Sequence, residues 1–401
     1  MKEGVSGISI NGNGSNIKQL IYKYGPISRI EISKKLDLTP PTITSYVFDL
    51  LASGLIRECK YATDCKSLGR KRTGLEIVSD YAYVMGIDVG PYKTYVVVTD
   101  LKGNVVQQKA YPILPGDFDS ALLRLSTIVN EVISLCDFEP YKLIAIGCGF
   151  PGYVSRTGDV IRFSSNYGWR NVPFKRRVEE LTGYPCIVMN NARARSVSIE
   201  MFSSIQLPDA YSYVLVAKGI ASPIIVGSNA VNPIFVAPGE IGHMILDREG
   251  PICKVCGNRG CLDVYSGEMA VTNRCRDVLD KTSVLKTLVD STNDITIDDI
   301  LEAQKQNDSV VCEIMKNAIS YLGIAIANLI NIFNPPLVLI DCYMMKNEVN
   351  KEYFLEYAEK NLYAINRADI RIEFVSFDKY RTAIGCAGAA IRKYVLLNEE
   401  I

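Results

Sequence analysis

A nineteen-residue segment in the middle of the chain limits the possible folds more than any other part of the sequence. It begins with His243, the only histidine present, and then holds three cysteines, Cys253, Cys256 and Cys261. One imidazole nitrogen and three thiolates are the ligand set of a closed, tetrahedral Zn²⁺ site. A site with four protein ligands has no open position, so the zinc would fold a loop and not activate water. The alternative interpretation is three unrelated buried cysteines beside a core histidine.

The same segment also offers groups that suit a small polar ligand. Glu240 lies three residues before His243, and Asp263 lies two residues after Cys261. A loop pinned by zinc, with Gly257 and Gly260 turning the chain, would hold both carboxylates near the imidazole. Carboxylates and a spare ring nitrogen suit polyol hydroxyls, which need several acceptors at fixed angles. The alternative is that both carboxylates are solvated.

The net charge of zero hides an uneven distribution along the chain. Residues 1–78 carry twelve Lys and Arg against seven Asp and Glu, a net charge of +5, and the remainder carries −5. A basic N-terminal module on an acidic body predicts that the first part binds a polyanion.

Three short helices are predicted within this basic module, after a polar, glycine-rich and mobile arm over residues 1–14. The first runs from Ser15 to Tyr24. Ser28 is the expected N-cap of the second, over residues 29–36, with a glutamate at the capping-box position. Thr39 is expected to cap the third, whose first turn tolerates two prolines because those amide hydrogens would be unpaired anyway.

The third helix and the segment after it have the character of a DNA-binding surface. The helix exposes small hydroxyl side chains early, as suits contacts with base edges and phosphates. Two strand-like runs follow, over residues 55–60 and 74–78, and the loop between them holds three consecutive cations. Such a wing can follow phosphates or enter a minor groove. The residues predicted to contact DNA are Thr39, Thr42, Thr44, Ser45, Tyr46, Arg70, Lys71 and Arg72.

Length and composition indicate a globular protein of two or three domains. The chain has 401 residues, of which 48% are hydrophobic and 22% charged. No signal peptide or long uncharged apolar run is apparent, and most of the twelve cysteines are isolated, as is usual in a reducing compartment. We therefore expect a cytoplasmic protein without a membrane span.

A new domain is predicted to begin at Tyr83. The pattern of apolar runs and turns from there to Cys148 predicts three strands, a helix over residues 120–135, and a fourth strand over residues 143–148.

This β-β-β-α-β order resembles the ribonuclease-H-like, actin-type ATPase domain of the ROK family, which comprises bacterial sugar kinases and sugar-responsive repressors. With its N-terminal winged helix-turn-helix, the chain looks like the repressor branch, which includes xylose and N-acetylglucosamine repressors. The family usually has Cys-x-Cys where this chain has Cys-x-x-Cys. The similar segments are Gly149–Gly152, Gly168–Phe174, Met189–Ala192, Pro238–His243, the cysteine cluster, Gly323–Pro335 and Ala387–Ala390.

The resemblance implies an α/β protein in which a winged helix-turn-helix precedes a two-lobed actin/hexokinase-type fold. The expected domains are the arm over residues 1–14, the winged helix-turn-helix over 15–78 and the kinase-like domain over 79–401. Within the last, a small lobe is expected over about 79–190 plus 385–401 and a large lobe over about 191–384.

Several kinase features of the family are missing, so we expect no enzyme activity and no catalytic residue. The family kinases use the aspartate of an Asn-Asp pair as base, whereas this chain has Asn190-Asn191, and an amide cannot accept that proton. Three loops expected to hold the nucleotide also depart from the family's glycine-rich patterns, at Gly90–Tyr92, Ala217–Ala221 and Ile340–Tyr343.

The sugar side is better preserved. By resemblance, the sugar-binding residues are Asn190, Asn191, Glu240, His243 and Asp263, the last standing where the family usually has glutamate. Arg193 and Arg195 follow the amide pair at positions usually held by small residues. They could recognise an anionic group such as a sugar phosphate, or they could form a solvated helix face.

Two functions are consistent with these features. The first is a repressor of carbohydrate-utilisation genes, in which a sugar effector changes the spacing of the winged helices of a homodimer or a dimer of dimers on operator DNA. The second is a repressor with a vestigial sugar site that is controlled by a protein partner. An active sugar kinase is the third and weakest alternative.

Overall fold

The computed structural model describes residues 12–60, 73–155, 157–227, 234–235 and 239–397. The chain divides into two compact units. Unit 1 comprises residues 1–206, 229–233 and 379–401, and unit 2 comprises residues 207–228 and 234–378.

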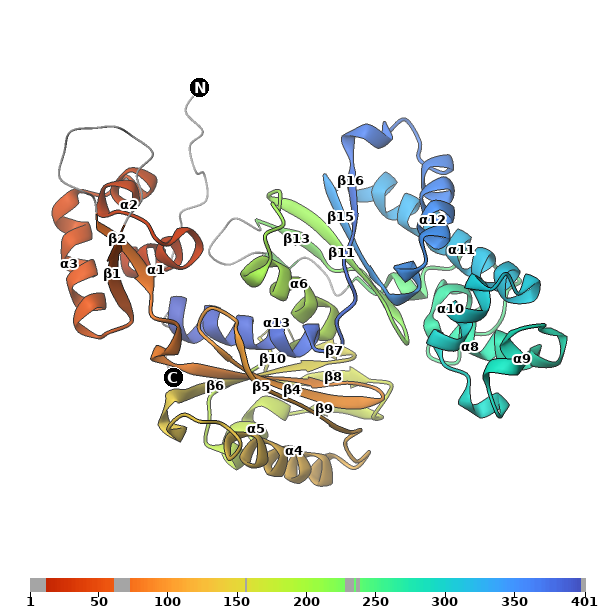
Figure 1. Cartoon of the computed structure of the whole chain (residues 1–401), viewed down its shortest axis with the longest axis horizontal. Coiled ribbons are helices and arrows are strands. Elements are labelled where there is room, and N and C mark those ends of the chain that lie inside the picture. The colour runs from red at the N-terminus through yellow and green to blue at the C-terminus, as the bar shows by residue number, and fades with distance from the viewer. Residues whose placement is uncertain (1–11, 61–72, 156, 228–233, 236–238, 398–401) are drawn as a thin grey trace. The chain divides into compact units, whose positions relative to one another are not determined.

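Unit 1 begins with the winged helix-turn-helix (Figure 1), and the predicted helices and strands are confirmed. At the start of the second helix, the Ser28 hydroxyl accepts a hydrogen bond from the Glu31 amide, and the Glu31 carboxylate accepts one from the Ser28 amide at 3.0 Å. This capping box is the one that the sequence predicts. The elements are α1 (Asn13–Tyr24), α2 (Arg29–Leu36), α3 (Pro40–Ala52), β1 (Ile56–Lys60) and β2 (Thr73–Ile77), with the two strands antiparallel.

A five-stranded sheet forms the centre of unit 1, in the order β10-β6-β3-β4-β5. Strands β3, β4 and β5 are antiparallel, whereas β6 and β10 run parallel to β3. This confirms the predicted β-β-β-α-β order. The elements are β3 (Tyr83–Val89), β4 (Lys93–Asp100), β5 (Val105–Pro112), α4 (Phe118–Ile133), β6 (Leu143–Phe150) and β10 (Cys186–Asn190).

Helices cover both faces of this sheet (Figure 1). One face packs against α4 and α5 (Phe174–Thr182), and the other against α13 (Arg381–Ala390), which in turn packs on α6 (Asn191–Phe202). A small antiparallel sheet is made by β7 (Tyr153–Val154), β8 (Ile161–Ser164) and β9 (Trp169–Val172).

Helix α13 packs closely against β3 and α6 because a glycine lies at each contact. An ideal Cβ placed on Gly86 of β3 would lie 1.8 Å from the Ala383 carbonyl oxygen. One placed on Gly385 of α13 would lie 1.7 Å from the Ala194 carbonyl oxygen of α6. Any side chain at either position would push the elements apart.

The winged helix-turn-helix shares a hydrophobic core with the rest of unit 1. Ile17 and Ile21 of α1 belong to the same buried cluster as Val84 of β3 and Tyr394, which lies in a π-helical segment (Ile391–Leu396) continuing from α13. The winged helix-turn-helix is therefore packed against this part of the unit and not merely joined to it by a linker.

Unit 2 is built on a second sheet, in the order β14-β13-β11-β15-β16, with β12 paired to β11. Its longest helix, α11 (Ser309–Phe333), is buried along one side in the core of the unit. By length and hydropathy alone, this helix is also long and apolar enough to cross a membrane. The strands are β11 (Ala210–Val216), β12 (Ile220–Ala221), β13 (Ile224–Val226), β14 (Ile234–Phe235), β15 (Leu337–Cys342) and β16 (Arg371–Phe374). The helices are α7 (Asp263–Ser266), α8 (Glu268–Asp277), α9 (Leu285–Leu288), α10 (Ile297–Lys305), α11 (Ser309–Phe333) and α12 (Glu348–Lys360).

Candidate functional site

The histidine and the three cysteines converge in unit 2. Their ligand atoms all lie within 4.8 Å of one another. The Cys256 and Cys261 sulfurs are 3.5 Å apart, and the Cys253 sulfur is 3.8 Å from Nδ1 of His243. A tetrahedral ion with Zn–S bonds of about 2.3 Å would separate its sulfur ligands by about 3.8 Å. The four residues therefore fit a structural zinc ion.

The backbone around these thiols explains how a short segment can bring them together. Gly257 and Gly260 both have positive φ, at 83° and 65°. An ideal Cβ on Gly260 would lie 1.6 Å from the Asp247 carbonyl oxygen, so the turn requires glycine there. Burial, followed by the neighbouring thiols, raises the pKa of Cys261 to about 12. This thiol therefore needs a nearby cation to ionise at neutral pH.

Two carboxylates predicted to bind sugar lie close enough to His243 to interact with it electrostatically. Withdrawal from water raises the pKa of both Glu240 and Asp263, whereas His243 lowers both pKa values. Asp263 is held in place because its Oδ1 accepts a hydrogen bond from the Ile220 amide at 2.8 Å. Nδ1 of the imidazole lies 3.8 Å from the Cys253 sulfur, so Nδ1 would be the atom that binds the zinc ion.

The other two predicted sugar residues, Asn190 and Asn191, belong to unit 1, where they begin α6. Asn190 is buried, and its Oδ1 accepts hydrogen bonds from the amides of Ala192 and Arg193 at 2.8 and 3.3 Å. Its Nδ2 donates to the Gly152 carbonyl at 2.9 Å. Asn190 thus caps the helix and joins it to the 149–152 loop, a role that the sequence did not indicate.

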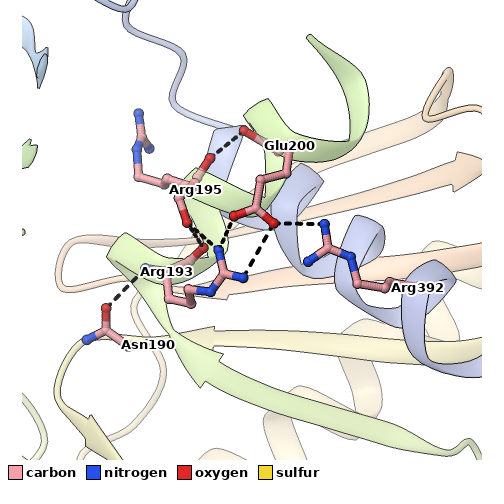
Figure 2. Close-up of polar contacts among 7 residues, drawn as sticks. Asn190, Arg193, Arg195, Glu200 and Arg392 are labelled. Carbon is pink, nitrogen blue, oxygen red and sulfur yellow. Dashed lines mark hydrogen bonds and ion pairs between the residues drawn. The ribbon is translucent and has the colours of Figure 1, made fainter. Parts of the chain in front are cut away.

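The two arginines of α6 are buried and not solvated, so one of the two alternatives that the sequence left open does not hold. Arg193 is 9% and Arg195 5% exposed, so the expectation of a solvated helix face is wrong. Arg193 forms an ion pair with Glu200, which also binds Arg392 at 2.8 Å (Figure 2). The partner of Arg193 is thus a buried carboxylate of its own helix, and Arg195 approaches the Thr382 hydroxyl at 3.5 Å.

Asp88, at the position where the family pattern begins, is buried, with 9% of its surface exposed. Burial raises the pKa of Asp88 to about 7, although Arg195 and Thr382 act in the opposite direction. The loop after it is stabilised internally, because the Tyr167 hydroxyl donates to the Gly90 carbonyl at 3.1 Å.

Backbone amides of the second expected phosphate loop are already engaged in unit 2. The Ala217 amide donates to the Gly219 carbonyl at 3.0 Å, and the Ile220 amide donates to Asp263. In the same sheet, the Tyr213 hydroxyl donates to the buried Asp341, which stands where a glycine pair is expected. These groups therefore have hydrogen-bond partners within the chain itself.

The predicted DNA-contacting hydroxyls lie on the accessible side of α3, opposite the buried Ile43 and Val47. Thr39 occupies the N-cap position, but its hydroxyl bonds that of Thr42 at 2.8 Å and caps no backbone amide. Four of the predicted residues, Thr39, Thr44, Ser45 and Tyr46, are exposed, and Thr42 is half-buried. The predicted wing residues Arg70, Lys71 and Arg72 lie outside the described residues.

Phe48 is a feature of this surface that the sequence analysis missed. Its side chain is 70% exposed and stands one helical turn after Thr44 and Ser45. A large apolar side chain so exposed on a recognition helix suits contact with thymine methyl groups. The helical spacing of Phe48 from Thr44 could have identified it.

Two family models match this chain. The model described as "ROK family" matches residues 84–392, and the one described as "Winged helix-turn-helix DNA-binding" matches residues 16–57. The "Xylose repressor" of Bacillus subtilis (strain 168) is 28% identical over 320 residues, covering 80% of this chain and 79% of that protein. The "DNA-binding transcriptional dual regulator NagC" of Escherichia coli (strain K12) is 26% identical over 332 residues, covering 82% of this chain and 79% of NagC.

Solved structures resemble the fold. A ROK family transcriptional regulator, described as a homologue of the E. coli MLC protein, matches with a TM-score of 0.81 at 24% identity, covering 96% of this chain and 97% of its own. A ROK family glucokinase from Streptomyces griseus matches with a TM-score of 0.68 at 23% identity, covering 77% and 99%. The predicted α/β class, with a winged helix-turn-helix before an actin/hexokinase-type fold, is confirmed.

Proposed function

The chain belongs to the ROK family, and on this premise we propose that it is a DNA-binding transcriptional repressor of carbohydrate-utilisation genes that responds to a sugar or sugar derivative. The observation that carries the proposal is the winged helix-turn-helix preceding the family domain, an arrangement that spans nearly all of both this chain and a regulator of known structure. The "Xylose repressor" of B. subtilis and the "N-acetylglucosamine repressor" of Escherichia coli O6:H1, which is 26% identical over 332 residues, make a pentose or an amino sugar the first effectors to test.

The kinase-like domain acts in this proposal as a sensor without catalytic activity. An amide at Asn191 cannot take the hydroxyl proton, and amides of the 217–221 loop are occupied within the chain. Sugar-dependent consumption of ATP by the purified protein would overturn this part of the proposal. A zinc ion held by His243, Cys253, Cys256 and Cys261 would supply no chemistry beyond fixing the loop that carries the sugar-binding carboxylates.

We expect Glu240→Ala to weaken effector binding at least tenfold, because a hydrogen bond to a charged group contributes about 1.5–3 kcal/mol. The measurement is a calorimetric titration of the zinc-loaded protein with D-xylose, N-acetylglucosamine and their phosphates, with and without an operator duplex selected by the wild-type protein. Glu249→Ala is the matched control, since Glu249 is an exposed carboxylate of the same loop. Unchanged affinity in Glu240→Ala would instead favour a vestigial site and control by a protein partner.

Replacing Arg70, Lys71 and Arg72 together by Ala should weaken binding to all duplexes. If each cation neutralises one phosphate, the slope of log K against log salt concentration becomes shallower by about 2.7, since each contact contributes about 0.9. The slope is measured by filter binding at salt concentrations between about 50 and 200 mM, a range over which affinity changes strongly. An unchanged slope would remove the wing tip from the interface.

The remaining parts of the proposal concern assembly and location. The two-fold symmetry of helix-turn-helix operators favours a homodimer or a dimer of dimers. We propose a cytoplasmic location, since the DNA of a bacterial repressor lies there. The proposed domain boundaries are at residues 14 and 78 and, for the two lobes, about 190 and 384. The compact units of the structure instead divide near residues 206 and 379, which places α6 in unit 1. Sedimentation of the protein with and without its operator tests the assembly.

A further inference from the structure

Helix α6 connects two parts of unit 1 that the proposed function must connect. It begins beside the 149–152 loop, because Asn190 caps its first amides and also donates to the Gly152 carbonyl. Asn190 and the loop are among the segments that resemble the sugar side of the family domain. The other end of α6 is held by ion pairs of Glu200.

A buried ion triad holds that far end. The Glu200 side chain is only 2% exposed, and it binds Arg193 of its own helix and Arg392 of the π-helical segment at the end of the chain (Figure 2). The Arg392 contact measures 2.8 Å, and the two arginine side chains are 11% and 16% exposed. If Glu200 moved away, two guanidinium groups would be left without their carboxylate in a largely dry environment, which is energetically costly. The three side chains are therefore expected to move together when α6 is displaced.

The segment that Arg392 belongs to is in turn bound to the winged helix-turn-helix. The Lys18 ammonium of α1, 3% exposed, donates to the Val395 carbonyl, and the Ser15 hydroxyl donates to the Leu397 carbonyl at 3.2 Å. A cation at the C-terminal end of a helical segment is favourable because the last carbonyls carry partial negative charge. Polar contacts therefore join α6 to the segment at the end of the chain, and the same segment to α1.

A second contact between α6 and the DNA-binding module is apolar. Met201 and Phe202, the last residues of α6, pack against the buried cluster that contains Ile21 of α1 and Ile77 of β2. A cleft of about 310 Å³ lies beside them, and its walls also include the polar residues Glu76, Lys102 and Ser203. The end of α6 therefore contacts the winged helix-turn-helix directly as well as through the end of the chain.

We infer that Glu200 is a positioning residue that couples the 149–152 loop to the winged helix-turn-helix through α6 and the end of the chain. The inference rests on the proposed function, because it assigns the path by which effector binding would alter the setting of α3. Glu200 touches neither ligand nor DNA in this role. Because Glu200 ties α6 to the end of the chain, and the end of the chain is bound to α1, the first turn of α6 can move at low energetic cost only if α1 moves with it.

Hydrogen exchange on the full-length protein tests the coupling without sugar or DNA. Asn190→Ala removes the N-cap and loosens the first turn of α6. In the wild-type background we expect this change to accelerate amide exchange in α1 at least about fivefold, the lower range of ordinary site-to-site coupling. In a Glu200→Gln background, where the link is broken, Asn190→Ala should leave exchange in α1 unaltered while still accelerating the first turn of α6.

Two further variants keep the test decisive. Arg392→Lys retains the charge but loses the planar guanidinium group. In this background Asn190→Ala should accelerate amide exchange in α1 less than it does in the wild type. The variant should remain folded, so it provides the test if Glu200→Gln folds poorly. Glu180→Gln removes the carboxylate of the exposed Arg176–Glu180 pair on α5 and should change nothing in α1. An Asn190→Ala effect confined to α6, or one reaching α1 equally in both backgrounds, would overturn the inference. Failure of every sugar to bind would overturn the proposed function and leave this result standing.

Discussion

Cys256→Ser should lower the affinity for zinc by at least about 100-fold and leave the 240–263 loop unfolded at stoichiometric metal. Structural zinc sites of this kind bind with about 10–16 kcal/mol, and loss of one of four ligands removes a substantial share of that free energy. Cys256 is the most exposed of the four ligands, so its substitution leaves no core cavity and isolates the effect of the metal. Zinc content after dialysis against a competing chelator, with proteolysis of the loop, gives the measurement.

The control for this change is Cys312→Ser, a half-buried cysteine of α11 outside the cluster. It should retain one zinc per chain and the same pattern of proteolysis. Effector affinity should fall in Cys256→Ser but not in the control, because the zinc loop carries Glu240 and Asp263. If Cys256→Ser kept both its metal and its effector affinity, the four residues would not be a zinc site.

Ser45→Glu should reduce operator binding by more than about 50-fold. Ser45 is exposed on α3 between the buried Ile43 and Val47, in the position where a recognition helix meets DNA. A lost base or phosphate contact costs about 1–3 kcal/mol, and a new carboxylate adds repulsion from the phosphates. Fluorescence anisotropy with a selected operator duplex at 150 mM salt, a physiological ionic strength, measures the loss.

Thr127→Glu adds the same charge on the exposed face of α4, away from the winged helix-turn-helix elements, and should bind the operator like the wild type. The comparison separates a local contact from a change in net charge. Phe48→Ala would complete the series by weakening only operators with thymine at the contacted position. Equal loss in Ser45→Glu and Thr127→Glu would show that α3 is not the reading helix.

Local sequence signals predicted the secondary structure of the first 150 residues well. The capping box at Ser28, the periodicity of Ile17 and Ile21, and the alternation of strand residues all act over a few positions, where side chain and backbone are already neighbours. The four zinc ligands were also predictable, since they lie within nineteen residues and their chemistry is restrictive.

Contacts between distant segments were not predictable from the sequence. Glu200 and Arg392 are 192 positions apart, and no local pattern indicates that they meet. For the same reason the approach of Arg195 to Thr382, 187 positions away, was not foreseen. Arg193 pairs with Glu200 of its own helix, but that carboxylate is buried only because Arg392 and the end of the chain pack beside it. The shared core of the winged helix-turn-helix and the end of the chain is a further long-range product of folding.

The glycines around α13 have a consequence for how unit 1 can deform. Gly86 and Gly385 bring backbone against backbone, and Gly147 of β6 does the same against Cys386. A helix seated on such notches cannot slip along the sheet by one residue, because a side chain would then enter each notch. The three contacts involve Ala383, Gly385 and Cys386, so α13 is fixed against the sheet and against α6 over a single turn, where no side chain larger than hydrogen can be accommodated at the three glycines.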